Sequence, residues 1–265
     1  MLSTVRSELT RLRQPRLLIT WFGLMVLFAV MIDTVMVSFV SDGAALPPAG
    51  PGVTFPTRAE LESSSGPVAG LAAASNMFGV VTLSLWAVAT AADYSSGLVR
   101  LLVAAEPRRW RLLAGKALAL ALVTAAATTV AAAVNAIAIP PAAMAAGLDT
   151  SAWGTDLVGV VVGGWLDLFL ALLVWGVLGL VIAVLTRSAA VAISVGIGYV
   201  LVVESLITML ADAPSDWLLG TTLHAIASGG TQAVAYGTAL ALGAGYVVIG
   251  LVLAGIVFTR RDVTD

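Results

Sequence analysis

Six long apolar runs, separated by polar or Gly/Pro-rich connections, dominate the pattern of the chain. They cover residues 17–40, 68–92, 112–139, 157–186, 189–211 and 236–258. A helix needs about 20 residues to cross the hydrocarbon core of a bilayer, which is about 30 Å thick. Each run reaches that length, so the pattern predicts an all-α polytopic membrane protein with six transmembrane helices, folded as a single domain over residues 1–265.

Lysine and arginine fall almost entirely on one side of these predicted spans. Twelve of the 13 basic residues lie in the N-terminal arm, the second-to-third connection, the fourth-to-fifth turn and the C-terminal tail: Arg6, Arg11, Arg13, Arg16, Arg100, Arg108, Arg109, Arg111, Lys116, Arg187, Arg260 and Arg261. Only Arg58 falls on the other side. Cytoplasmic connections carry an excess of Lys and Arg, so we expect both termini to be cytoplasmic.

Composition supports a membrane protein. Hydrophobic residues make up 60% of the chain, charged residues 11%, and the mean hydropathy is +1.03. Such values lie outside the usual range of soluble proteins. The chain has no Cys, which excludes disulfides, thiol chemistry and Cys-based metal sites. Its first apolar run is longer than the ~7–15 residues of a signal-peptide core, so we expect it to be retained as a span.

The arm before the first span has a helical period of its own. Apolar side chains recur at helical spacing at Leu2, Val5, Leu9 and Leu12, with charged residues elsewhere on the wheel. Basic amphipathic helices lie in the membrane interface with the apolar face down. We therefore expect an interfacial helix over residues 1–16, which Pro15 would turn into the membrane. The alternative is a basic tail that only sets topology.

Motifs for catalysis are absent from the sequence. Gly115-Lys116 lacks the upstream Gly of a P-loop and precedes Ala117 rather than Ser or Thr. The single His, His224, lies in an outer connection without a second His nearby, so we expect it to be solvated and expect no metal site. The chain is thus predicted not to be an enzyme. It could drive transport only through a partner or an ion gradient.

The most specific segment is the second-to-third connection, residues 93–111. Asp93 closes a span, Gly97 breaks the helix, and a short amphipathic helix follows until Pro107. A basic and aromatic cluster then leads to Lys116 in the next span. The pattern predicts a compact charged helix held between two spans. The alternative is a basic hairpin whose charges only set topology.

This connection resembles the corresponding segment of type-2 ABC exporter permeases, the drug- and antibiotic-export-like family. The matching positions are Asp93, Gly97, Arg100, Leu101, Pro107, Arg109 and Lys116. The amphipathic arm, the six-span layout and the ending Phe258-Thr259-Arg260-Arg261-Asp262 are also similar to that family. Leu98 departs from it, since many members carry Thr there, and Asp93 replaces the commoner Glu.

The resemblance implies a permease subunit in a bacterial cell membrane, paired with a second copy or a related permease. A hydrophobic or amphiphilic substrate, such as a drug, antibiotic, peptide or lipid, would move outward. Cytoplasmic ABC ATPase subunits would bind the N-terminal arm and the short helix, where Arg100, Arg108 and Arg109 would help to hold them. ATP and magnesium would bind only the partner ATPase, so this chain would need no cofactor, and no nucleic acid partner is implied. Two alternatives remain: an ion-coupled secondary transporter and a non-transporting scaffold subunit.

Three acids fall inside the predicted spans: Asp33, Asp167 and Glu204. Ionisable groups at that depth are costly and usually face a cavity or a partner, so these are candidates for the translocation path. Asp33 and Glu204 could instead lie at the headgroups. Gly159-x-x-x-Gly163 could form a helix-packing face. Aromatic belt positions are predicted for Trp21, Trp110, Trp153 and Trp217.

Overall fold

The computed structural model describes residues 2–41, 55–106, 108–204, 206–207 and 217–260. Within these ranges the regular structure is helical, which confirms the all-α prediction for them. The elements are α1 (Leu2–Leu12), α2 (Pro15–Ser41), α3 (Arg58–Glu62), α4 (Gly66–Ala73), α5 (Ser75–Ser95), α6 (Leu98–Ala105), α7 (Arg109–Ala145), a 3-10 turn η1 (Ser151–Gly154), α8 (Leu157–Thr186), α9 (Ala189–Gly198), a π-helical segment η2 (Tyr199–Glu204), α11 (Leu219–Ala227) and α12 (Tyr236–Arg260).

Five of these helices, α2, α5, α7, α8 and α12, are long and apolar enough to cross a membrane, which indicates a membrane protein. They follow five of the predicted runs closely. The run predicted at 189–211 is different, because α9 is short and passes into the π-helical segment η2. The end of that run lies outside the described residues.

Two of the predicted spans have other boundaries than the apolar pattern suggests. The second begins as α4 and continues as α5 after a break at Ala74. The third was expected to end before Pro140, but α7 continues through Pro140 and Pro141 to Ala145. Each proline lacks the amide hydrogen that would bond the carbonyl four residues earlier. Because that loss removes bonds only in the last turns, the helix continues to Ala145.

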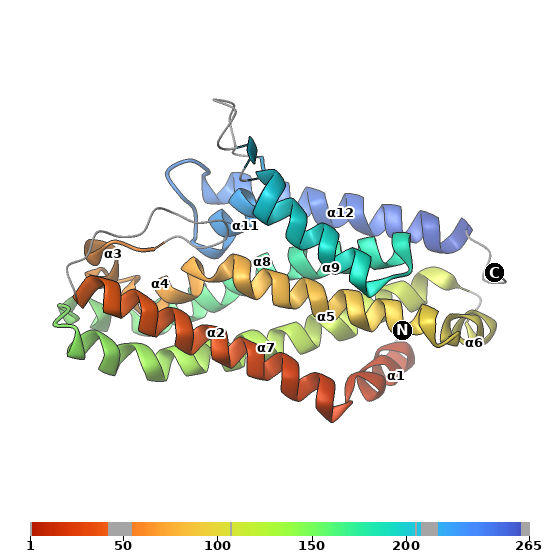
Figure 1. The fold of residues 1–265 in the computed structure, drawn as a ribbon, viewed down its shortest axis with the longest axis horizontal. Coiled ribbons are helices and arrows are strands. Elements are labelled where there is room, and N and C mark those ends of the chain that lie inside the picture. Colours follow the sequence, from red (N-terminus) through yellow and green to blue (C-terminus); the bar gives the residue numbers. More distant parts are fainter. Residues whose placement is uncertain (1, 42–54, 107, 205, 208–216, 261–265) are drawn as a thin grey trace.

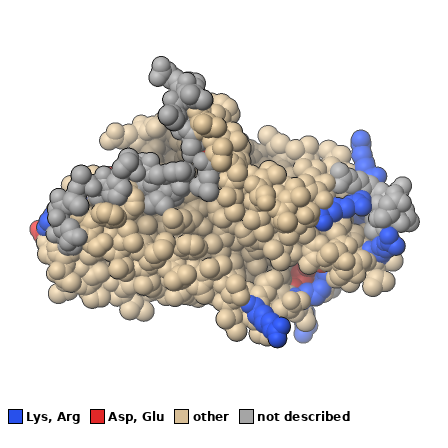
Figure 2. All heavy atoms as spheres, viewed as in Figure 1, with Lys and Arg blue, Asp and Glu red and all other residues tan. Residues whose placement is uncertain are grey.

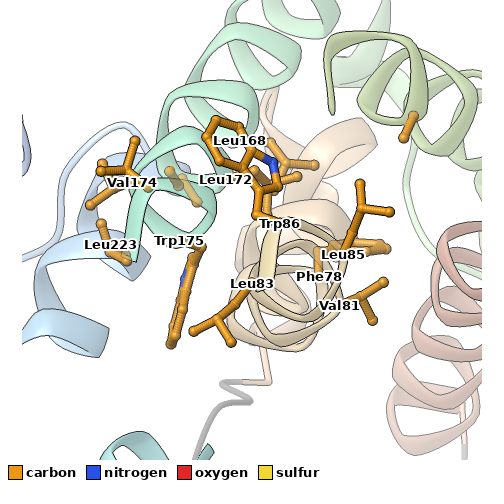
Figure 3. Packing of buried hydrophobic residues seen from close by; sticks show 14 of the residues in the cluster. Phe78, Val81, Leu83, Leu85, Trp86, Leu168, Leu172, Val174, Trp175 and Leu223 are labelled. Carbon is orange, nitrogen blue, oxygen red and sulfur yellow. The ribbon is translucent and has the colours of Figure 1, made fainter. Parts of the chain in front are cut away.

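The core of the bundle lies between α5 and α8, whose apolar residues are mostly buried (Figure 3). The indole of Trp86 packs over Gly176, and the indole of Trp175 packs over Gly79, so each helix receives a ring from the other. The indole nitrogen of Trp86 donates to Thr124 Oγ1 of α7 at 3.0 Å. By contrast, few of the apolar side chains of α12, and only about a third of those of α2, are fully buried, and both helices expose several large ones.

Basic side chains gather at one end of the bundle, beside α1 and α6; we call this the basic end (Figures 1 and 2). The end that carries α3 and α4 is called the opposite end. At the basic end α1 packs against α7 and buries Val5 and Leu12 in protein. The predicted belt positions of Trp21 and Trp153 are wrong, because both are buried and donate to the carbonyls of Val81 and Leu61.

Candidate functional site

Four charged side chains from three helices meet at the basic end. Lys116 of α7 lies 3.0 Å from Glu8 Oε2 of α1 and 2.8 Å from Asp93 Oδ2 of α5, and it also donates to the carbonyl of Ala89 at 3.2 Å. Arg11 bonds the other Glu8 oxygen at 2.6 Å. Glu8, Asp93 and Lys116 are all buried, with exposed fractions of 2%, 9% and 8%. We call Glu8, Arg11, Asp93 and Lys116 the ion cluster.

The ion cluster fixes the relative positions of α1, α5 and α7. A buried charge is tolerated only when partners satisfy it, and Lys116 has three acceptors at hydrogen-bonding distance. Removing one partner of such a pair typically costs about 3–5 kcal/mol, since the other charge stays buried. The structure thus places Asp93 and Lys116, two of the coupling residues named from the sequence, in direct contact. Glu8 had not been singled out, because it is one acid within a basic arm.

The short predicted helix of the connection forms as α6, next to the ion cluster. Gly97 makes the turn from α5 with φ of 69°, a left-handed conformation that favours glycine. Val99 and Leu102 face a small cavity that the ion cluster also lines. Arg100, Leu101 and Ala104 are exposed on the other side, and Leu101 is 69% exposed. The outer surface of α6 is therefore apolar with a basic edge.

The remaining predicted coupling residues surround this surface. Arg109 donates to the carbonyls of Phe258 and Thr259 at 3.4 and 3.2 Å, so it caps the end of α12. Arg108 is exposed, and its amide bonds the carboxylate of Glu106. Trp110 is 54% exposed with the guanidinium of Arg111 5.7 Å from its ring centre. Pro107 lies outside the described residues.

At the opposite end a cavity of about 580 Å³ lies between α4, α8, α11 and the segment after α11. Asp167 of α8 lines it, and one of its oxygens accepts a hydrogen bond from the Tyr236 hydroxyl. Gly159 and Gly163 also line it, and no atom comes within 4 Å of the place where a Gly163 Cβ would stand. This glycine face therefore opens a cavity rather than packing against a helix of the same chain.

His224 lies on α11 at the cavity wall, partly buried, so the prediction of a solvated loop side chain is wrong. Its ring nitrogens lie 3.4 Å from Ser75 Oγ and 3.5 Å from Ser228 Oγ. Burial lowers the pKa of the imidazole below its ordinary value, so the ring is neutral near neutral pH. No group of three or more His, Asp or Glu within the described ranges could hold a metal ion.

Asp33, the second acid predicted in a span, is buried between α2, α4 and α7 with an exposed fraction of 1%. Among the described residues, neither carboxyl oxygen has a hydrogen-bond donor. The nearby Asn135 donates an amide hydrogen to the Pro67 carbonyl at 2.6 Å, and its own oxygen also has no donor within the described residues. The Asp33 and Asn135 oxygens both lie within 3.4 Å of the point where a Cβ on Gly70 would stand.

The third acid, Glu204, ends the π-helical segment and accepts the amide hydrogen of Gly220 with both oxygens, at 2.7 and 3.0 Å. It therefore caps the start of α11. The contacts of the three acids belong to different elements: α4 and α7 for Asp33, α12 for Asp167, and α11 for Glu204. Within the described residues, these contacts do not join the three acids into one continuous polar path. Tyr236 donates to Asp167, and Asn135 lies near Asp33. Nothing in the sequence indicated either role beyond the two residues being polar.

No curated protein matches the chain. The model of one protein family, described as "Protein of unknown function (DUF2705)", matches residues 26–264. That range includes every predicted span except the first half of the first one. It also includes α6 and all the described residues that line the cavity at the opposite end. By this match over most of its length, the chain belongs to the DUF2705 family.

Proposed function

We propose that this chain is the membrane permease subunit of an ATP-driven exporter, with ATP hydrolysed by a separate ATPase subunit. The basic end would face the bacterial cytoplasm, and α9 with η2 would contribute a sixth span. A second permease copy or a related permease would complete the transporter. The exposed apolar surfaces of α2 and α12, such as Ile19 and Val248, suit either lipid or that second permease.

The observation that carries this proposal is the outer surface of α6 at the basic end. Leu101 and Ala104 are exposed there one helical turn apart, with Arg100 beside them. An exposed apolar strip with a basic edge suits a docked protein better than water. The helix is short and anchored at both ends, by the Gly97 turn on α5 and by its connection to α7. A push on α6 would therefore reach the membrane helices.

The ion cluster supports the same mechanism. It joins α1, α5 and α7 directly behind α6, where the inner face of α6 contacts the small cavity lined by Lys116. Movement of α6 by a docked ATPase would thus be passed to three helices together rather than to one. The cavity at the opposite end would lie where an exported molecule leaves.

The test compares matched charges introduced at the basic end. Leu101→Asp and Ala104→Asp place an acid in the apolar strip and should each lower, at least about tenfold, the amount of ATPase that copurifies with the tagged chain. Ala190→Asp adds the same charge at an exposed position in the first turn of α9 and should retain the ATPase. Membrane yield and gel-filtration profile establish equal folding.

Full recovery of the ATPase by Leu101→Asp and Ala104→Asp would contradict docking on α6. If no ATPase copurifies even with the unchanged chain, the exporter proposal itself fails. Asp33 favours a second candidate, an ion-coupled transporter, because a buried carboxyl without a donor is a site where a transported proton could bind. Substitution of Asp33 separates the two candidates and is treated below.

A further inference from the structure

The wall of the cavity at the opposite end combines two acids with apolar residues and with uncharged polar side chains such as Ser65, Thr231 and Gln232. Asp167 and Glu60 are the acids in its wall, and neither Lys nor Arg is among the described residues that line it. Arg58, which is near Glu60 in the sequence, pairs with Glu62 at 2.8 Å and donates to the Gly147 carbonyl at 2.7 Å. His224 adds no positive charge, because its imidazole is neutral. The described wall thus offers two carboxyl groups and no Lys or Arg to pair with them.

We propose that this cavity is the binding site for an amphiphilic organic cation, held by Asp167 against the apolar part of the wall. The inference rests on the proposed export function and names its substrate class. The volume of about 580 Å³ falls within the ~300–1,000 Å³ usual for small-molecule sites. Phe55, Val68 and Val160 provide apolar surface for the body of such a molecule.

Asp167 is oriented for this role. The Tyr236 hydroxyl engages one carboxyl oxygen, so the carboxylate is fixed in direction. The other oxygen points to the segment after α11, 3.5 Å from the place of a Gly229 Cβ. Glu60 is less available, since its carboxylate accepts from the amide and the hydroxyl of Thr57. One oriented acid beside apolar surface matches a single positive charge on a bulky molecule.

A metal ion fits this cavity less well than an organic cation. Divalent cations need about six or more oxygen ligands, and Asp167 offers one oxygen that is not already bonded to Tyr236. An organic cation needs only one charge contact, because burial of its apolar surface supplies the rest of the affinity. The glycines at 159 and 163 keep α8 thin at this point, which leaves room for a bulky group.

The test uses a pair of ions that share a shape and differ in charge. Tetraphenylphosphonium and tetraphenylborate are equilibrated with the purified full chain in phospholipid nanodiscs, and empty nanodiscs give the partitioning into lipid. The unchanged chain should bind the phosphonium above the lipid level and should not bind the borate. Equal retention of both ions, or of neither, would overturn the proposal.

Three variants locate the site. Asp167→Asn should weaken phosphonium binding about tenfold. Asp149→Asn removes one charge at the same end outside the cavity wall and should leave binding unchanged. Gly163→Leu keeps Asp167 but fills the open space and should remove binding, even if Asp167→Asn does not fold. Unchanged phosphonium binding by both cavity variants would refute the assignment. No ATPase is present, so this outcome is independent of the docking test on α6.

Discussion

Asp33 and Asp93 are both buried aspartates in apolar helices, but their surroundings differ in charge. Asp93 lies against the Lys116 ammonium, whereas Asp33 has neither a cation nor a hydrogen-bond donor within the described residues. A buried carboxyl group without a partner is costly. The same side chain therefore stabilises the fold at one site and strains it at the other.

The two sites predict opposite effects for the same substitution. Asp33→Asn should raise the unfolding midpoint in detergent, because the new amide hydrogens can bond the Asn135 oxygen and no charge remains; the gain should be about 1–3 kcal/mol. Asp93→Asn should lower the midpoint, since Lys116 loses one of its two carboxylate partners. Thermal unfolding followed by tryptophan fluorescence measures both.

Transport by these variants then decides between the two candidate functions. An ATP-driven exporter should keep its activity with Asp33→Asn, because the substitution alters no ATPase contact. A proton-coupled transporter that uses Asp33 should lose transport while remaining folded. A fall in the unfolding midpoint of Asp33→Asn as large as that of Asp93→Asn would show that Asp33 is charged and paired.

Single residues were predicted from sequence only where a local pattern marked them. Asp93 and Lys116 stood out, because they frame a helix break between two spans. Their third partner, Glu8, lies more than 100 positions from Lys116 in the sequence. No local pattern indicates that Glu8 would contact Lys116. His224 was placed in an outer connection and expected to be solvated, because no second His lies nearby; the local sequence does not reveal that α11 forms there and partly buries it.

Helices α5 and α8 are joined by reciprocal packing of tryptophan on glycine. A Cβ on Gly79 would lie 2.2 Å from Trp175 Nε1, and one on Gly176 would lie 2.4 Å from Trp86 Cε2. Both distances are far below van der Waals contact. The two glycines are therefore required for the close approach of these helices, whatever their own helical preference.

Gly79→Ala and Gly176→Ala should each destabilise the fold by about 1–3 kcal/mol, because the methyl group overpacks a tight core. Gly245→Ala on α12 meets nothing within 4 Å and should be neutral or slightly stabilising. Combining Gly79→Ala with Trp175→Leu should recover part of the loss, which a double-mutant cycle measures. Equal unfolding midpoints for the three glycine-to-alanine variants would contradict this packing.

The helices themselves follow largely from the sequence, since long apolar runs leave the backbone few other ways to satisfy its hydrogen bonds in lipid. The ends of the helices followed less directly from the sequence than the helices themselves. The extension of α7 past Pro140 depends on packing of Ile139 and Ala143 against Leu61 and Trp153, which the local sequence does not reveal. The π-helical segment at Tyr199–Glu204 likewise has no signal in the apolar pattern.

At the scale of the whole molecule, the distribution of charge predicts that the two ends lie on opposite sides of the membrane. The chain has no native Cys, so one introduced thiol reports one position. Ser96→Cys is exposed at the basic end and should react only with membrane-permeant reagents in intact cells. Thr155→Cys is exposed at the opposite end and should react with impermeant reagents. The reverse pattern of labelling would invert the proposed orientation.

The length of α7 has a mechanical consequence. Its 37 residues make a rod about 55 Å long, well beyond the ~30 Å hydrocarbon core. The buried positions in its middle are mostly small residues, among them Ala119, Ala127 and Ala131, so few large side chains oppose a change of tilt there. A rod that pivots at its middle moves its ends in opposite directions. Under the proposed mechanism α7 would be a lever, and a push on Lys116 at one end would displace Asn135 and α4 toward the other.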